Sequence, residues 1–407
     1  MRLSRRTLIA TAATTAAALP LSRARAQKPV LKLGVLTDMS GPYKDIAGPV
    51  ALASTELAVA EFKAAHPGME VEVISADHQN KPDIGVAITR KWFDVEGADV
   101  VMEVANSAVS LAVAGVAREK NKIFLACGGA TSDLTGSACS PNTIHWVYDT
   151  YMLAKSTGGA MVKTGGDSWY FLTADYAFGH ALQRDVTGFV QQAGGKVLGA
   201  SPYPFPGTTD FSSFLLQAQA SGAKVLGLAN AGTDTISSIK QAKEFGIKMK
   251  LAGLLVFISD IHSMGLPISQ GLVLTESFYW DMNPRTRAFA ERLKPRAPTV
   301  RPTMTQAGTY SCASHYLKVA AAMGPAEAKK SGAATIARMK ATPTDDDAFG
   351  PGSIRADGRK IHPSYLFEVK APAESKAPWD YYKLLATTPA DEAFRPLAQG
   401  GCPMVKA

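Results

Sequence analysis

The stretch VLTDMSGPYKDIAGP, residues 35–49, decides how this chain folds, because a buried strand ends in it and a helix follows it. An apolar run gives way to small polar residues, two Gly-Pro steps and a tyrosine, and apolar residues then recur at helical spacing over residues 50–65. Loops of this composition at the carboxyl end of a strand commonly bind ligands in α/β proteins. The stretch therefore predicts a strand, a ligand-binding loop and a helix, in that order.

The same succession of strand and helix is repeated along most of the chain, in two series. Apolar strands are expected at residues 31–36, 71–76, 99–105 and 122–128 in the first series, and at 169–174, 196–201, 224–231, 250–257 and 271–278 in the second. Apolar strands that are joined by helical crossovers form parallel sheets with right-handed connections. The pattern predicts an α/β protein of two Rossmann-like, doubly wound lobes.

The segment after residue 281 contains helical patterns without strands to pair with them. Helices are expected at 285–293, 309–323 and 332–341, followed by a hairpin over 352–369 with Asp357-Gly358 as its turn. We expect these helices to return to the first lobe, so that several chain crossings form a hinge around which the lobes can close. The predicted parts are an export signal at 1–26, a first lobe at 28–148 plus 282–342, a second lobe at 149–281 plus 343–385, and a tail at 386–407.

The first 26 residues have the composition of an export signal. Residues 4–9 form a twin-arginine pattern, a weakly apolar stretch continues to Leu21, and Ala24-Arg25-Ala26 is a small-residue cleavage site. The apolar stretch is too short to span a membrane, and no other apolar run in the chain approaches that length. We expect a signal of the twin-arginine type, with an ordinary secretory signal as the open alternative. The mature protein is then expected in the periplasm and not embedded in the membrane.

The charge balance argues against a polyanionic partner. Of the net charge of +8, five arginines lie in the first 26 residues, where there is no acid, and the rest of the chain carries only +3. The seven histidines lack metal-ligand spacing, and GGATSDLTG at 128–136 lacks the spacing and the lysine of a phosphate-binding loop. We therefore expect no nucleic acid, no metal and no cofactor.

The four cysteines divide into two kinds by their surroundings. Cys139 and Cys402 lie in Pro- and Gly-rich loops, where a disulfide could form without distorting a helix or strand. Cys127 ends an apolar strand and Cys312 lies in a helical run, which favours buried free thiols. We expect a disulfide between Cys139 and Cys402.

Several motifs resemble one family. They are GVLTDMSGPY at 34–43, ADHQNKPD at 76–83, EVANSAVSLAVAGVAREKNKIFLACGGATSDLTG at 103–136, FLTADYAFG at 171–179 and DFSSFLLQAQASGAKVLGLANAG at 210–232. In order and spacing they resemble the periplasmic solute-binding proteins of ABC importers, in the branched-chain amino-acid-binding class with the type I periplasmic-binding fold. The resemblance implies a monomeric, non-catalytic receptor that captures a small solute between its lobes and hands it to an inner-membrane permease.

The resemblance also implies ligand contacts at the loops that follow the strands of both lobes. The implied residues are Ser40, Tyr43, Asn106, Ser107, Gly129, Ala130 and Thr131 in the first lobe, and Tyr176, Phe178, Asn230, Gly232 and Phe257 in the second. Ser107 in addition opens a predicted helix, and the unpaired N–H groups at a helix N-terminus bind anions. Capping by Ser40 and Thr131, and core packing by Tyr176 and Phe178, are the alternative interpretations of those four residues.

One departure from the family bears on the solute. Amino-acid binders of this class place a carboxylate near the end of a second-lobe strand to pair with the ligand ammonium, whereas this sequence has Leu254, Leu255 and Phe257 there. Burying an ammonium group without a counter-charge costs several kcal/mol. The sequence thus favours a carboxylate-bearing solute with an apolar or aromatic body, although Asp234 or Asp260 could restore ammonium binding.

Other functions remain as alternatives to import of an organic acid. A ligand-sensing module for a membrane receptor and a true branched-chain amino-acid binder both require only a closing cleft. An exported hydrolase is the least favoured, because the sequence has no G-x-S-x-G elbow, no zinc motif and no evident Ser/His/Asp set. No catalytic residue is therefore expected.

Overall fold

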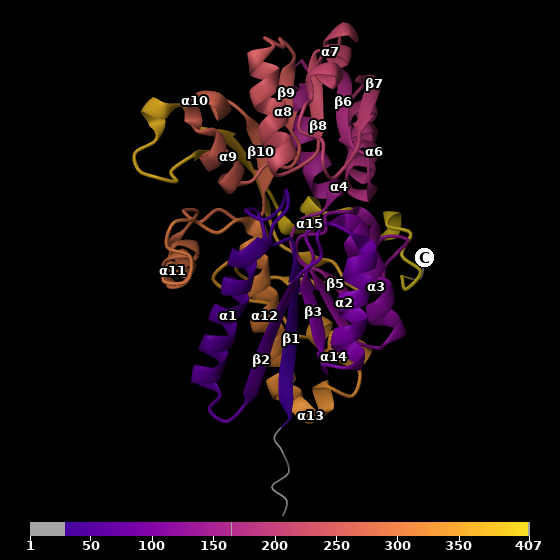
Figure 1. The fold of residues 1–407 in the computed structure, drawn as a ribbon, viewed down its shortest axis with the longest axis vertical. Coiled ribbons are helices and arrows are strands. Elements are labelled where there is room, and N and C mark those ends of the chain that lie inside the picture. The colour runs from indigo at the N-terminus through magenta and orange to yellow at the C-terminus, as the bar shows by residue number, and fades with distance from the viewer. Residues whose placement is uncertain (1–28, 164, 406–407) are drawn as a thin grey trace, which may run out of the picture.

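The chain folds into two α/β lobes stacked along its long axis, as the alternating pattern predicts (Figure 1). The structure, a computed structural model, describes residues 29–163 and 165–405. The predicted export signal at 1–26 lies outside the described residues. No helix among the described residues is long and apolar enough to cross a membrane.

The first lobe is built on a five-stranded parallel sheet of order β2-β1-β3-β4-β5. Its strands are β1 (Val30–Thr37), β2 (Glu70–Asp77), β3 (Val100–Glu103), β4 (Ile123–Ala126) and β5 (Thr143–His145). The inner strands β3 and β4 are buried along their whole length, which explains their continuous apolar sequences. Of these five strands, the three-residue β5 has no counterpart among the predicted strands.

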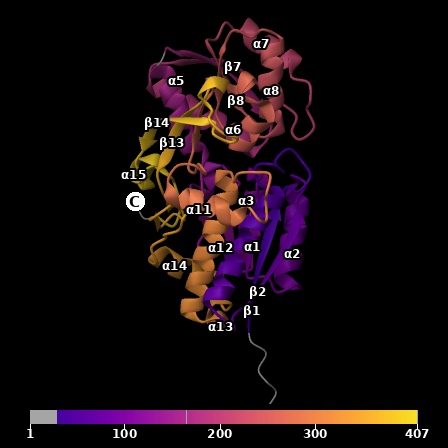
Figure 2. The same cartoon turned by 90° about the vertical axis from the view of Figure 1, so that its left-hand side faces the viewer.

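Helices from two distant parts of the chain cover this sheet. They are α1 (Gly48–Ala65), α2 (Pro82–Asp94), α3 (Ser107–Glu119), the 3₁₀ turn η1 (Ser132–Thr135), α11 (Pro284–Leu293), α12 (Met304–Met323), α13 (Pro325–Ala328) and α14 (Gly332–Ala341). The helix α12 runs along α1 (Figure 2). Its N-terminus is tied to the loop before α1, because Thr303 donates a hydrogen bond to the carbonyl of Ile46 at 2.7 Å. The late helices thus return to the first lobe, as expected.

The second lobe has a four-stranded parallel sheet of order β7-β6-β8-β9 and a three-stranded antiparallel sheet of order β10-β13-β14. The strands are β6 (Ser168–Ala174), β7 (Lys196–Tyr203), β8 (Val225–Ala229), β9 (Lys250–Gly253), β10 (Val273–Glu276), β13 (Ser364–Val369) and β14 (Tyr382–Thr388). The helices are α4 (Thr150–Leu153), the π turn η2 (Ala154–Gly158), α5 (Gly159–Lys163), α6 (Ala177–Gln192), α7 (Ser212–Ala220), α8 (Thr233–Glu244), α9 (Ile258–Met264) and α10 (Leu266–Ser269).

The strand expected at 250–257 is shorter than predicted. It ends at Gly253, and Phe257 precedes α9 instead of continuing the strand. The Asp260 carboxylate accepts the Phe257 N–H at 2.9 Å and so fixes the start of the helix. Residues 254–257 therefore form a buried turn between strand and helix.

The predicted hairpin forms, but it lies against the first lobe. It consists of β11 (Ser353–Ile354) and β12 (Lys360–Ile361), with Gly358 in its turn. Arg359 pairs with His145 at the end of β5 and donates hydrogen bonds to the carbonyls of Val147 and Tyr148, where the chain leaves that lobe. This buried arginine therefore holds the hairpin to the crossing segment.

The C-terminal tail is fastened to the first lobe by a disulfide between Cys139 and Cys402, the pairing expected from the sequence. Three short helical turns precede or interrupt this tail: η3 (Pro372–Glu374), α15 (Ala390–Ala393) and η4 (Leu397–Gln399). The remaining two cysteines, Cys127 and Cys312, are free and buried.

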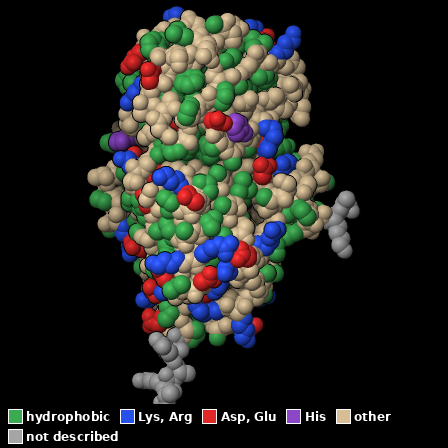
Figure 3. All heavy atoms as spheres, turned by 45° about the vertical axis from the view of Figure 1, so that its right-hand side comes forward, with side chains coloured by type: hydrophobic (Ala, Val, Ile, Leu, Met, Phe, Trp, Pro, Cys, Tyr) green, Lys and Arg blue, Asp and Glu red, His purple; other side chains and the backbone are tan. Residues whose placement is uncertain are grey.

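Charged side chains of the first lobe form pairs of opposite sign on its surface. Arg90 pairs with Glu119, and Lys120 pairs with Asp94 at 2.9 Å. On the face shown in Figure 3, basic and acidic side chains lie interspersed over this lobe. This face therefore carries no stripe of a single charge.

The disulfide closes a loop with a sequence separation of 263 residues, so its loss should destabilise the protein. We expect the double variant Cys139→Ser, Cys402→Ser to lose about 2–4 kcal/mol of unfolding free energy in urea titrations. Dithiothreitol should lower the midpoint of the wild type and leave that of the double variant unchanged. Equal midpoints for the two proteins without reductant would contradict this assignment.

Candidate ligand-binding site

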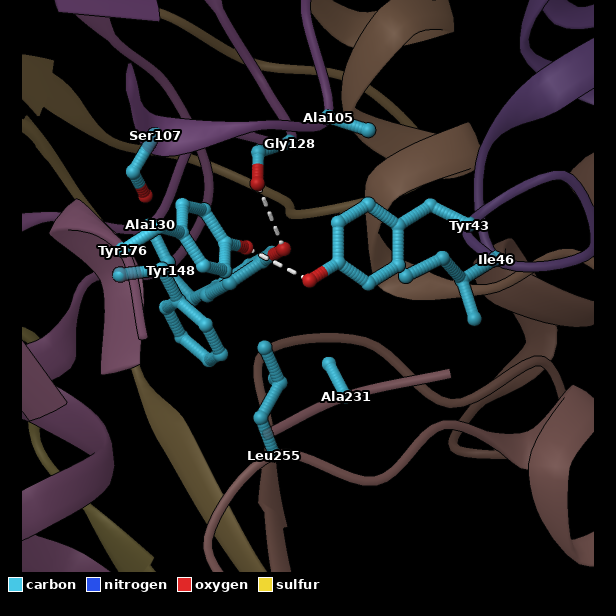
Figure 4. Close-up of a pocket in the computed structure, with 11 residues that line it drawn as sticks. Tyr43, Ile46, Ala105, Ser107, Gly128, Ala130, Tyr148, Tyr176, Ala231 and Leu255 are labelled. Carbon is cyan, nitrogen blue, oxygen red and sulfur yellow. Dashed lines mark hydrogen bonds between the residues drawn. The ribbon is translucent and has the colours of Figure 1, made fainter. Parts of the chain in front are cut away.

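A small cavity lies between the lobes, where the carboxyl ends of both parallel sheets meet (Figure 4). This is the position in which open α/β sheets bind ligands. Its lining residues are Tyr43, Ile46, Ala105, Ser107, Gly128, Ala130 and Tyr148 from the first lobe and the crossing segment, and Tyr176, Phe178, Ala231 and Leu255 from the second lobe. Both lobes therefore contribute to its lining.

Five of the residues predicted to touch a ligand lie in this wall. They are Tyr43, Ser107, Ala130, Tyr176 and Phe178. They come from the loops or helix starts that follow strands of both lobes, so the topology brings together residues that are far apart in sequence. Their contact with a ligand stays a prediction.

Other predicted side chains bind neighbouring protein groups. Ser40 donates to Asp77 at 2.7 Å, Asn106 caps α3 by accepting two backbone N–H groups, Thr131 caps η1, and Asn230 bonds Thr235 and Ser238. Capping, the alternative interpretation of Thr131, thus describes its side chain in this structure. None of these four residues is among those that line the cavity.

Three further predicted residues lie one or two positions from residues that line the cavity. Gly128, Ala231 and Leu255 line the cavity in place of Gly129, Gly232 and Phe257. Residues one or two positions apart in these loops and turns point in different directions, so a neighbour of a lining residue can lie behind the wall. Phe257 lies there, with its ring edge against Tyr148 at 5.8 Å between centroids.

Ile46, Ala105 and Tyr148 line the cavity although they are not among the residues predicted from the sequence. Tyr148 lies on the segment that crosses between the lobes, and its hydroxyl donates to the carbonyl of Gly128 at 2.9 Å. An aromatic residue in a hinge is the signal that could have identified it.

A buried carboxylate organises the first-lobe side of the cavity. Both oxygens of Asp38 are used: one accepts the N–H of Gly41 at 2.6 Å, and the other accepts the N–H of Tyr43 at 2.8 Å and the amide of Asn80 at 2.7 Å. Asn80 in turn accepts a hydrogen bond from Asn106 at 3.3 Å. The loops after β1, β2 and β3 are thereby joined, and Tyr43 is directed toward the second lobe.

Tyr43 and Tyr176 meet across the cleft. Their hydroxyl oxygens are 2.6 Å apart, and the ring of Phe205 stacks on both tyrosines (Figure 4 shows the hydroxyl pair). The N–H of Thr233 also donates to the carbonyl of Pro42 at 3.3 Å. Burial raises the pKa of both tyrosines well above the ordinary value, so their hydroxyls stay neutral at physiological pH. The lobes are in contact, and the cleft is closed.

The cavity wall has no charged side chain, since no Asp, Glu, Lys or Arg is among its lining residues. The two acids that could have restored ammonium binding are engaged elsewhere. Asp234 accepts the Tyr203 hydroxyl at 2.8 Å, and Asp260 accepts the Phe257 N–H. Burial raises the pKa of Asp234 to about 6 and that of Asp260 to about 7, which weakens both as counter-charges. In the described part of the chain, no group of three or more His, Cys, Asp and Glu residues could hold a metal ion.

Comparison with known proteins places the chain among solute-binding proteins. A family model for periplasmic binding proteins matches residues 30–376. A periplasmic binding protein from Burkholderia mallei is 47% identical, with a TM-score of 0.89 over 93% of this chain and 100% of that one. A branched-chain amino-acid ABC transporter ligand-binding protein from Burkholderia xenovorans is 36% identical, with a TM-score of 0.79 over 92% and 99%.

A more distant solved structure shares the fold. A solute-binding protein of an ABC transporter from Rhodopseudomonas palustris, solved in complex with benzoate, is 22% identical, with a TM-score of 0.80 over 92% of this chain and 99% of that one. A search among curated proteins gave no match.

The Asp38 network can be tested with an isosteric change. Both carboxylate oxygens of Asp38 accept hydrogen bonds. In Asp38→Asn one of these oxygens is replaced by an NH₂ group, which cannot accept a hydrogen bond in either orientation of the amide and would lie against N–H donors. We expect a loss of about 1.5–3 kcal/mol of unfolding free energy, the range for hydrogen bonds to charged groups, measured by urea titration. Asp45→Asn, at an exposed position in the same loop, should change it by no more than about 0.5 kcal/mol. Equal effects of the two changes would show that the network does not hold the loop.

Proposed function

Since the chain belongs to the periplasmic binding proteins, among the ABC-transporter solute-binding proteins of the branched-chain amino-acid-binding type, we propose that it captures a small carboxylate-bearing solute with an apolar or aromatic body. The observation that carries this proposal is the cavity wall, which offers neutral hydroxyl donors and apolar surface but no charged side chain. An α-amino acid would bury its ammonium group there without a counter-charge, at a cost of several kcal/mol.

The first-lobe side of the cavity suits a carboxylate. Ser107 is the first residue of α3, whose N-terminus carries partial positive charge. Its hydroxyl oxygen accepts the Thr131 N–H at 3.1 Å, so the hydroxyl proton is what Ser107 can offer to a solute. The hydroxyl pair of Tyr43 and Tyr176 supplies one further donor, because one of its two protons is used in the hydrogen bond between them. A carboxylate would thus be bound by hydroxyl groups and a helix terminus, without an arginine or lysine.

The rest of the cavity suits a compact apolar body. Ile46, Phe178, Ala231 and Leu255 provide aliphatic and aromatic surface from both lobes. The space that these side chains leave between the lobes is small, which favours a compact solute. The Rhodopseudomonas palustris protein solved with benzoate has the same fold, and a benzoate-sized acid fits this description.

The partners and route follow from the family and from the N-terminal sequence. Periplasmic binding proteins are located in the periplasm and deliver small solutes to an inner-membrane permease. We propose that this chain is exported by the twin-arginine route, docks transiently on its permease and acts as a monomer without catalysis. A permease and an ATPase encoded beside it would support import, and a neighbouring histidine kinase would favour sensing.

A panel of solutes tests the proposed chemistry. We expect benzoate-type or short aliphatic acids to raise the melting temperature of the mature protein, and leucine and benzamide to have little effect. A solute at a hundredfold excess over its Kd adds about 2.7 kcal/mol of stability, which a thermal-shift assay resolves. Stabilisation by leucine without stabilisation by any acid would exclude the proposal and support a branched-chain amino-acid binder.

The contribution of the cross-lobe hydroxyl pair can be measured separately. Tyr176→Phe removes a hydrogen bond that exists only when the lobes are closed, and one hydroxyl that faces the cavity. We expect an acid found in the panel to bind about 2- to 10-fold more weakly by titration calorimetry, the value of one net hydrogen bond. Tyr170→Phe is the matched control, because its hydroxyl bonds Ser201 at 2.8 Å within the second lobe. A similar loss of affinity in both variants would indicate a general effect of removing a hydroxyl.

A further inference from the structure

Glu103 lies immediately behind the cavity wall, at the end of β3. It is fully buried, and one of its carboxyl oxygens is only 2.3 Å from where a Cβ on Gly128 would be. A Cβ at that position would also lie 2.7 Å from the Cα of Ala105. Gly128 and Ala105 both line the cavity, so a single layer of backbone separates this carboxyl group from a bound solute.

No basic group balances this acid. Neither carboxyl oxygen makes a hydrogen bond of ordinary geometry, and Glu103 forms no ion pair within the described part of the chain. The titratable groups around it are all acidic or weakly acidic: Asp38 after β1, Cys127 after β4, and Tyr148 on the crossing segment. Burial raises the pKa of Glu103 to about 8, and the charge of Asp38 raises it further, despite lowering by Thr37 and nearby backbone N–H groups.

The backbone that carries Glu103 is held in an unfavourable conformation. The backbone angle φ is 77° at Glu103 and 59° at the following Val104, values that residues other than glycine seldom adopt. Such residues persist where the surroundings enforce them, and they concentrate at functional sites. Here the result is that an acid, which would be solvated at most strand ends, is turned inward against the cavity wall.

We propose that Glu103 is a specificity-determining residue that selects solutes by charge: as a neutral acid it admits an anionic solute beside Gly128, and as a carboxylate it excludes one. This inference rests on the proposed function, because it concerns the charge of the solute in the same cavity. Glu103 acts through the wall, without touching the solute.

The physical basis is repulsion between the Glu103 carboxylate and the negative charge of the solute, which are separated by Gly128. In the protein interior such a repulsion is poorly screened. Affinity for an anion should therefore fall as the pH rises through about 8, where Glu103 loses its proton. Binding of an anion near that pH should be accompanied by proton uptake. A neutral solute should show no such dependence, and a cationic solute should show the opposite one.

The test is titration calorimetry with benzoate from pH 6.5 to 9.5, with benzamide as the neutral probe if it binds. We expect the wild-type Kd for benzoate to rise about sevenfold between pH 7 and pH 9.5 when bound benzoate raises the pKa of Glu103 by about one unit. The Kd of Glu103→Gln should be independent of pH. Measurements in two buffers of different ionisation enthalpy should show proton uptake by the wild type at pH 8.5 and none by the variant.

Two other buried groups titrate in the same range and serve as controls. Burial lowers the pKa of Lys360 to about 8 and raises that of Asp260 to about 7. Lys360→Met and Asp260→Asn should keep the wild-type pH dependence. A pH-independent Kd in the wild type, a dependence that survives in Glu103→Gln, or tighter benzoate binding at high pH would each overturn the proposal.

Failure of the proposed function can be recognised separately. If no acid binds at any pH, the organic-acid function fails. The protonation of Glu103 can still be followed through the pH dependence of the stability of the ligand-free protein. A folded-state pKa above the unfolded value of ~4.3 means that the wild type loses stability as the pH rises toward 8. The melting temperature of Glu103→Gln should thus exceed that of the wild type by an amount that grows from pH 5 to pH 9. A constant difference would show that Glu103 titrates normally and would overturn its role.

Discussion

The first-lobe side of the cavity depends on the buried carboxylate of Asp38. Three parallel strands end side by side, and each end leaves backbone N–H groups that need acceptors. Asp38 supplies acceptors for its own loop and anchors Asn80, which holds Asn106 at the start of α3. The Asp38 network positions Tyr43 by accepting its N–H, and Tyr43 in turn forms the hydroxyl contact with Tyr176 of the other lobe. A charge kept out of the cavity thus organises a wall that has no charge of its own.

Most of the fold could be predicted from the sequence, because apolar strands and amphipathic helices each leave a local pattern. The parts that could not were set by distant contacts. The hairpin at β11 and β12 was recognised by its turn, but its place was decided by Arg359, which satisfies carbonyls more than 200 residues away. The three-residue β5 is too short for a pattern. The strand expected to run to residue 257 stops early because Asp260 stabilises a helix start in its place.

The candidate site could be predicted only to within a residue or two. Family motifs located the right loops, and five of the predicted residues line the cavity. Which residue of a loop faces the cavity depends on the local backbone conformation. Gly128 and Leu255 line the cavity, whereas the predicted contacts were the nearby Gly129 and Phe257. Small polar residues such as Thr131 can either cap a helix or face a ligand, and only the folded geometry distinguishes the two.

The charge selectivity of the site is best understood from what lies behind its wall. A lining without acids explains why an ammonium group is disfavoured, but it does not by itself explain how an anion is tolerated near Asp38 and Glu103. The Asp38 carboxylate accepts hydrogen bonds from Gly41, Tyr43 and Asn80, whereas burial of Glu103 outweighs the Thr37 and backbone donors near it and favours its protonated form. Gly128 permits this arrangement, because any side chain there would collide with the carboxyl group. Gly128 and Glu103 therefore act together. Because Gly128 has no side chain, the Glu103 carboxyl group lies close to the cavity, and its protonation state can determine the charge of the solutes that bind.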